Sequence, residues 1–147
     1  MKVEALPAYT NKVKQLVKPG VLYIDRHHIE TERMYREIHE ADVVKVLQGG
    51  FAVELRQNGT LIWQGLDADG RKLELMLSLL NKEREETIET SSTDALRVST
   101  AYDPTMDDAK LRQDWLKENT DYEVFTPDGR IRRKVKVEIV RKPGGLK

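Results

Sequence analysis

A two-residue turn between apolar strands restricts the fold of this chain more than any other feature. Asn58-Gly59 separates Phe51 to Arg56 from Thr60 to Gly65, and an Asn-Gly pair in this setting predicts a tight β-hairpin. After a second turn, leucines alternate with other residues from Arg71 to Leu79. A period of two is typical of a strand with one buried face, so the three segments predict an antiparallel meander.

Two further segments extend the predicted sheet. Ala95 to Tyr102 carries Leu96 and Val98 on one face and stops before Pro104, which predicts a fourth strand. The short β-prone run Val21 to Ile24 fits an edge strand.

Two short helices are predicted directly before the meander. The first covers Ile29 to Arg36 and has few apolar residues, and the second begins after Ile38. Asp42 lies in the first turn of the second helix, where a carboxylate favours the positive end of the helix dipole. Gly49-Gly50 is expected to end this helix, because glycine adopts the left-handed conformation of a helix C-terminus without strain.

Both ends of the chain add elements. An amphipathic helix is expected within residues 1–18, with Pro7 in its first turn and Pro19-Gly20 after its end. Asp107 to Glu118 is predicted to be helical. The final hairpin is predicted from Tyr122 to Phe125, a Thr-Pro-Asp-Gly turn, and Ile131 to Val140.

These elements predict an α+β fold. Short N-terminal helices pack on a four-stranded antiparallel sheet, and a C-terminal helix and β-hairpin follow. The predicted organisation is an N-terminal helix over residues 1–20, a core domain over residues 21–105, and a C-terminal extension over residues 106–147.

Composition excludes several classes of protein. The chain has 147 residues and no cysteine, which excludes a disulfide scaffold, a thiol nucleophile and a cysteine-rich zinc site. It has no apolar run of the length that crosses a bilayer, and its first residues lack the apolar core of a signal peptide. We expect a cytoplasmic protein with no membrane partner.

Charge is divided unevenly along the chain. The net charge is zero, yet residues 126–147 hold eight basic and two acidic residues, which gives this segment +6 and leaves −6 for the remainder. A basic strand predicts an acidic ligand, although a solvated strand face explains it equally well. The predicted nucleic-acid-binding residues are Arg130, Arg132, Arg133, Lys134 and Lys136.

A set of histidine, arginine and tyrosine residues could cleave RNA without a metal ion. Such a reaction needs a base for the 2′-hydroxyl proton, an acid for the leaving oxygen and a cation for the phosphorane charge. We expect His28 to be the base or acid, Arg33 and Arg71 to bind phosphate, and Tyr102 to be an acid or a stacking ring. Arg36 completes the predicted catalytic set.

Structural roles for the same residues are also open. His28 could cap a helix, and Tyr102 could pack under Pro104. Arg33 and Arg36 could form exposed pairs with nearby glutamates, each worth only ~0.3–0.5 kcal/mol.

No metal site or cofactor is predicted. His27, His28 and His39 lack the spacing of a known zinc motif such as His-Glu-x-x-His. The Asp67 to Gly70 turn resembles the start of a calcium loop but lacks the later ligands.

The order of several residues resembles a small bacterial family of domains of unknown function. The matching residues are His28, Arg33-Met34, Arg36, Ile38, Asp42-Val43, Val46-Leu47, Gly49 and the ending Thr100-Ala101-Tyr102-Asp103-Pro104. The chain departs from the family pattern at Glu37, which is often glycine there, and at His39, which is often serine or threonine. Domains of this kind are similar to the barnase–EndoU–colicin–RelE superfamily of toxin ribonucleases.

This resemblance implies a RelE-like α+β core over residues 21–105 and a toxin-type, metal-independent endoribonuclease. RNA would be the substrate, and a cognate antitoxin or immunity protein would be the partner. Two alternatives stay open: a non-catalytic nucleic-acid or protein-binding module that uses the basic hairpin, and an immunity protein whose acidic body faces a basic toxin.

Overall fold

The computed structural model describes residues 5–118, 124–125 and 131–133, and they form two compact units. The first unit comprises the chain up to Glu32 together with Ile38–Pro104. The second comprises Arg33–Glu37 and the chain from Thr105 onward. The N-terminal helix therefore belongs to the same unit as the sheet, and Arg33–Glu37 leaves that unit in the middle of the segment predicted as the core domain.

The first unit is built on a five-stranded sheet with the strand order β1-β5-β4-β3-β2. The strands are β1 (Leu22–Ile24), β2 (Phe51–Leu55), β3 (Thr60–Leu66), β4 (Lys72–Leu80) and β5 (Ala95–Tyr102). Strands β2 to β5 form the predicted antiparallel meander, and the α+β class is confirmed.

The prediction of four antiparallel strands was wrong, because β1 adds a fifth, parallel strand beside β5. Within the predicted run Val21 to Ile24, Leu22–Ile24 forms the edge strand expected there. A strand of three residues shows no periodicity, and its partner lies more than 70 residues away along the chain, so the sequence holds no local sign of the parallel direction.

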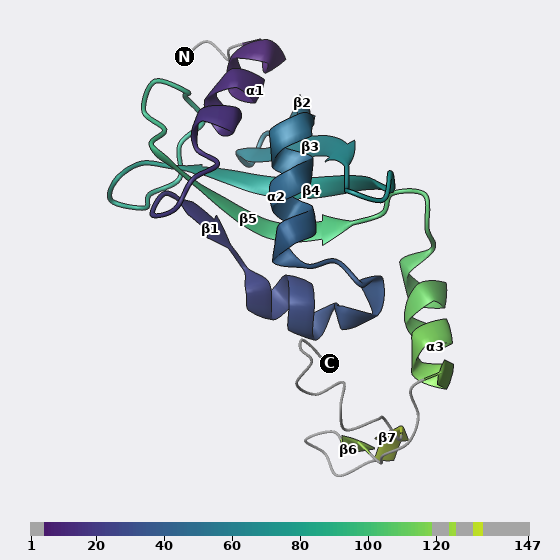
Figure 1. Ribbon diagram of the computed structural model, residues 1–147. Helices are drawn as coiled ribbons and strands as arrows, with labels where there is room; N and C mark the ends of the chain where they lie inside the picture. The colour runs from purple at the N-terminus through teal and green to yellow at the C-terminus, as the bar shows by residue number, and fades with distance from the viewer. Residues whose placement is uncertain (1–4, 119–123, 126–130, 134–147) are drawn as a thin grey trace. The chain divides into compact units, whose positions relative to one another are not determined.

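Helices α1 (Leu6–Gln15) and α2 (Glu40–Gly49) pack on one face of this sheet (Figure 1). The hydrophobic core between these helices and the sheet includes the alternating leucines of β4 and the fully buried Trp63 of β3. Tyr9 of α1 is also fully buried, and its hydroxyl donates a hydrogen bond to the carbonyl oxygen of Ile88 at 2.6 Å. Pro7 stands in the first turn of α1, as predicted.

The single helix predicted over Ile29 to Arg36 was wrong. The chain instead forms a π-helical segment, His27–Glu32, and then a short 3₁₀ turn, Met34–Arg36. Glu37 follows with a φ of +56°, a left-handed conformation that an α-helix does not continue through. The few apolar residues noted in the sequence cannot support a continuous buried helix face.

Helix α2 begins and ends where the sequence predicts. The left-handed conformation expected of a glycine at its end is, however, not the reason that Gly50 is needed. Its φ is −97°, so the left-handed conformation is not used. A Cβ atom at Gly50 would instead collide with the carbonyl oxygen of Gln64, and would lie 2.6 Å from Trp63 Nε1 and 2.7 Å from the Val46 carbonyl oxygen. Trp63 Nε1 donates a hydrogen bond to that same Val46 oxygen at 2.9 Å, so the glycine lets the end of α2 lie directly on β3.

The second unit contains the predicted C-terminal helix, α3 (Asp108–Glu118), and the short strands β6 (Val124–Phe125) and β7 (Ile131–Arg133). These two strands pair antiparallel, as the predicted hairpin requires. Of the residues predicted to bind nucleic acid, Arg132 and Arg133 lie in β7, while Arg130, Lys134 and Lys136 lie outside the described residues.

In the part of the chain that the structure describes, no helix is both long and apolar enough to cross a bilayer.

Neighbouring glycines at the end of α2 should respond oppositely to alanine. A Cβ at Gly49 meets nothing within 4 Å, so Gly49→Ala should stabilise the fold by about 0.5–1 kcal/mol through helix propensity. Gly50→Ala forces the helix away from β3 and should cost about 1–3 kcal/mol. Urea unfolding of both variants measures the difference, and equal effects would contradict the close packing described here.

Candidate functional site

The position of His28 follows from the pairing of β1 with β5. The amide of Asp25, just after β1, donates to the carbonyl oxygen of Val98 at 2.9 Å, so the chain stays beside β5 as it enters the π-helical segment. Ile29 in that segment is 1 % exposed and anchors it to the core. The carboxylate of Asp25 accepts a hydrogen bond from the His28 amide at 3.1 Å. These contacts hold the backbone of His28 beside β5.

The His28 imidazole lies between a carboxylate and a hydroxyl. Its Nδ1 is 3.0 Å from Glu32 Oε1, and its Nε2 is 2.9 Å from Thr100 Oγ1 on β5. An ionised carboxylate can only accept hydrogen bonds, so Nδ1 must carry the hydrogen. In the neutral ring Nε2 is then the acceptor, and it receives the hydrogen bond of the Thr100 hydroxyl. His28 therefore has the orientation and tautomer that a general base at Nε2 needs.

The preceding residue, His27, lacks this setting. Its side chain is 75 % exposed, against 24 % for His28, and its Nε2 lies 3.6 Å from Glu32 Oε2. Two adjacent histidines thus share one carboxylate, but only His28 also has a hydroxyl on its other nitrogen.

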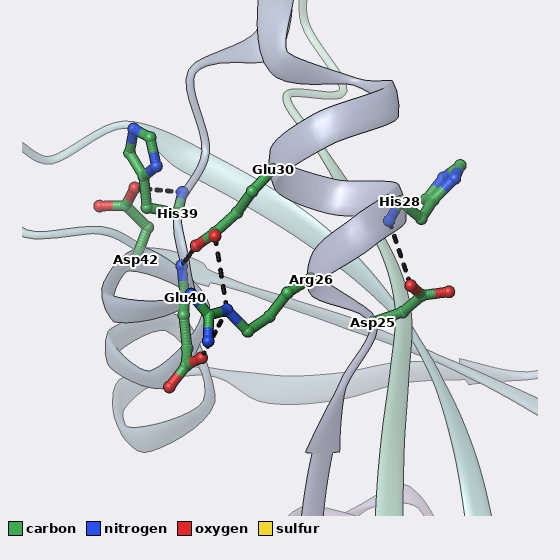
Figure 2. A network of polar contacts seen from close by, with 7 residues as sticks. All are labelled: Asp25, Arg26, His28, Glu30, His39, Glu40 and Asp42. Atoms are coloured by element: carbon green, nitrogen blue, oxygen red, sulfur yellow. Dashed lines mark hydrogen bonds and ion pairs between the residues drawn. The ribbon is translucent and has the colours of Figure 1, made fainter. Parts of the chain in front are cut away.

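A second set of polar contacts fixes the π-helical segment to the start of α2, on the side away from His28 (Figure 2). Glu30 accepts a hydrogen bond from the Glu40 amide at 2.6 Å. Arg26 Nε lies 3.5 Å from Glu30 and 3.2 Å from the Glu40 carboxylate. Asp42 accepts a hydrogen bond from the His39 amide at 2.8 Å, which agrees with its predicted place in the first helical turn.

Tyr102 lies two residues after Thr100 on β5 and is paired with Glu74 of β4. The Tyr102 hydroxyl donates a hydrogen bond to Glu74 Oε2, and Gln64 Nε2 donates to Glu74 Oε1 at 2.8 Å. The hydroxyl hydrogen therefore points at the Glu74 carboxylate. Of the two roles predicted for Tyr102, this contact favours the stacking ring over the acid.

Arg71 is bound within the turn between β3 and β4. Its Nε donates to Asp67 Oδ2 at 3.0 Å and its amide donates to Asp67 Oδ1 at 2.8 Å. Burial alone would raise the pKa of the Asp67 carboxyl, but these hydrogen bonds and that from the Asp69 amide outweigh it and hold the pKa below its usual value. A structural role for Arg71 therefore stands beside the predicted role in phosphate binding.

Arg36 belongs to the second unit and is held at the start of α3. Its Nε lies 2.7 Å from Asp108 Oδ1, and the hydroxyl of Tyr35 donates to Asp108 Oδ2 at 2.5 Å. The hydrogen bond from Arg36, opposed by burial and assisted by Tyr35, lowers the pKa of the Asp108 carboxyl. With a side chain only 13 % exposed, Arg36 serves to join α3 to the 3₁₀ turn. Arg33 also belongs to this unit.

In the first unit, His28 therefore lies beside the stretch of β5 that holds Tyr102. Its Nε2 contacts Thr100, which is two residues before Tyr102 on that strand. Sequence reasoning missed the partners Glu32, Thr100 and Glu74. Glu32 follows His28 by four residues, and Thr100 opens the Thr-x-Tyr-x-Pro ending, so both carried a signal. For Glu74 the sequence offered no signal other than its position in the alternating pattern of β4.

Among the described residues, no group of three or more histidine, aspartate or glutamate side chains is placed to hold a metal ion.

Comparison of the chain with protein-family models, curated proteins and solved structures gave no match.

The pKa of Asp67 predicts how stability changes in acid. Because folding lowers this pKa, the contribution of Asp67 is complete above the unfolded value of about 3.9 and is lost as the pH falls through the lower, folded value. Asp67→Asn should destabilise the protein at neutral pH by about 1–3 kcal/mol, because the hydrogen bonds of a buried carboxylate are lost.

Thermal unfolding of parent and Asp67→Asn across the acid range measures this effect. The stability difference should shrink as the pH falls below about 4. A constant difference at all pH values would contradict an ionised, hydrogen-bonded Asp67.

Proposed function

We propose that the protein is a toxin-type, metal-independent endoribonuclease in which His28 transfers the proton. The observation that carries this proposal is the His28 imidazole between Glu32 and Thr100, at 3.0 Å and 2.9 Å. Carboxylate, imidazole and hydroxyl in this order are the arrangement of an oriented general base. The ordered resemblance to the toxin-ribonuclease superfamily supports RNA as the substrate.

In the proposed reaction, the Thr100 side chain rotates away from His28 Nε2, and the substrate hydroxyl takes over the hydrogen bond to that nitrogen. The ribose 2′-hydroxyl gives its proton to His28 Nε2, and its oxygen forms a bond to the adjacent phosphorus. The bond from phosphorus to the 5′-oxygen breaks, and the departing oxygen takes a proton from solvent. Glu32, whose side chain is half exposed, stabilises the imidazolium that forms through its opposite charge.

The other predicted residues have supporting roles in this proposal. Tyr102 provides a ring for base stacking, which is a sequence-tolerant source of affinity for single strands. The prediction that Arg33 binds phosphate concerns the second unit and forms no part of this arrangement. The proposed partner is a cognate antitoxin or immunity protein, and the proposed location is the cytoplasm.

Cleavage of total RNA and tRNA in the presence of EDTA tests the proposal. The parent should cut, and His28→Ala should reduce the rate by about 10²–10⁴-fold, the contribution of a positioned general base. Glu32→Gln should also slow the reaction, because the carboxylate that fixes the tautomer is lost.

His27→Ala is the matched control, since it removes an adjacent, exposed histidine and should leave the rate unchanged. The proposal fails if the parent does not cut RNA, or if His28→Ala and His27→Ala behave alike. Binding without turnover, with a steep salt dependence that weakens when Arg132 and Arg133 are neutralised, would instead favour the binding module.

A further inference from the structure

The two edges of the sheet in the first unit are protected to different degrees. Strand β2 ends the sheet on one side (Figure 1). Its Ala52 amide donates a hydrogen bond to Thr10 Oγ1 of α1 at 2.9 Å, and a bulge interrupts the strand between Ala52 and Glu54. Both features keep a further strand from pairing there. Strand β1 ends the sheet on the other side and has neither feature among the described residues.

The backbone of β1 presents hydrogen-bonding groups on the side away from β5. The Val21 carbonyl oxygen and the Asp25 amide are bonded to β5, at 2.8 Å and 2.9 Å. Backbone groups of successive residues in a strand face opposite sides, so those of Leu22 and Ile24 face outward. The Leu22 amide donates to the Lys18 carbonyl oxygen at 3.2 Å. Among the described residues, this leaves the Leu22 carbonyl oxygen and the Ile24 amide for another strand.

An apolar groove runs along this edge, on the face of the sheet that α1 and α2 cover. Its volume is about 480 Å³. Four half-buried apolar side chains line it: Val17 just after α1, Leu22 and Ile24 of β1, and Val44 of α2. Leu22 and Ile24 also pack against the hydrophobic core. A strand beside β1 would therefore bury apolar surface in addition to forming hydrogen bonds.

The two ends of the groove carry opposite charge. Near the start of β1, Lys18 is exposed and has no ion-pair partner among the described residues. Beyond the end of β1, the Arg26 guanidinium lies between two carboxylates, 3.5 Å from Glu30 and 3.2 Å from Glu40 (Figure 2). These three side chains, which we call the Arg26 cluster, together carry one net negative charge.

From this arrangement we infer that the groove binds β1 of a second copy of the chain, antiparallel and about a two-fold axis beside Tyr23. The axis places each Ile24 amide opposite the Leu22 carbonyl oxygen of the other copy. Antiparallel strands also bring the start of one beside the end of the other, so each Lys18 meets the negative Arg26 cluster of the other copy. Parallel strands would instead place Lys18 beside Lys18.

A two-fold interface must be self-complementary, and this surface is so in both hydrogen bonding and charge. The inference does not depend on the proposed ribonuclease function. Because the paired strands have only three residues each, the interface is small and the dimer should be weak, with a dissociation constant in the micromolar range. Since β1 leads directly to Asp25 and His28, pairing would also hold the segment that carries His28.

Sedimentation equilibrium of the whole chain from about 1 μM to about 1 mM tests the association. The average mass should rise from that of one chain toward that of two. Exchange of the Ile24 amide hydrogen should slow over the same range, because pairing protects it from solvent. A mass of one chain at every concentration would overturn the second copy as the occupant and leave the edge to a strand of another protein.

Two charge reversals test the geometry. Lys18→Glu should weaken the dimer by about 10–30-fold, because two attractive contacts between exposed charges become repulsive. Glu40→Lys should have the same effect, since it makes the Arg26 cluster positive. Mixed in equal amounts, the two variants should associate as well as the parent, because every contact between unlike variants again joins opposite charges.

Lys72→Glu is the matched control. It makes the same charge reversal at an exposed lysine of β4, two strands away from β1, and should leave the association unchanged. The inference is overturned if Lys18→Glu dimerises as well as the parent, or if the mixture of the two reversed variants stays monomeric.

Discussion

The parallel pairing of β1 with β5 is the constraint on which the candidate site depends. Three residues of β1 and the following Asp25 run in the same direction as β5, so the chain that leaves β1 continues toward Thr100. An antiparallel β1 would deliver the π-helical segment to the other end of the strand. The buried Ile29 and the contacts of Glu30 with the start of α2 then fix the rotation of this segment, and His28 faces β5.

The rest of the first unit serves to keep that strand in place. One face of the sheet is closed by α1 and α2. The approach of α2 to β3 requires the glycine at position 50 and is fixed by the indole hydrogen bond from Trp63 to Val46. The other face carries polar side chains together with apolar ones such as the buried Ile62. Alternation along β4 and β5 places Leu75 and Ala101 in the core and Glu74, Thr100 and Tyr102 on that other face. The stability of the fold and the proposed activity come from opposite faces of the same strands.

Sequence alone predicted the elements whose signals are local. Asn58-Gly59 and the alternating leucines gave the meander, and the glycines after Leu47 gave the end of α2. Features that depend on distant residues were missed or wrong. The direction of β1 is set by a partner far along the chain, and the π-helical segment depends on contacts with β5 and α2. The same applies to the site: His28 and Tyr102 were predicted from residue type and order, but the hydrogen bonds of Gln64 and Tyr102 to Glu74 form only after three strands have paired.

The tautomer of His28 is the most direct test of the central claim that this ring is held between Glu32 and Thr100. The chain has three histidines, so ¹⁵N-edited NMR of the imidazole rings gives few signals, and the His28→Ala spectrum assigns the one of interest. At about pH 8, where an exposed imidazole is neutral, His28 should carry its hydrogen on Nδ1 and show an unprotonated Nε2. A hydrogen on Nε2, or the averaged signal of a ring that exchanges between its two tautomers, would contradict the account.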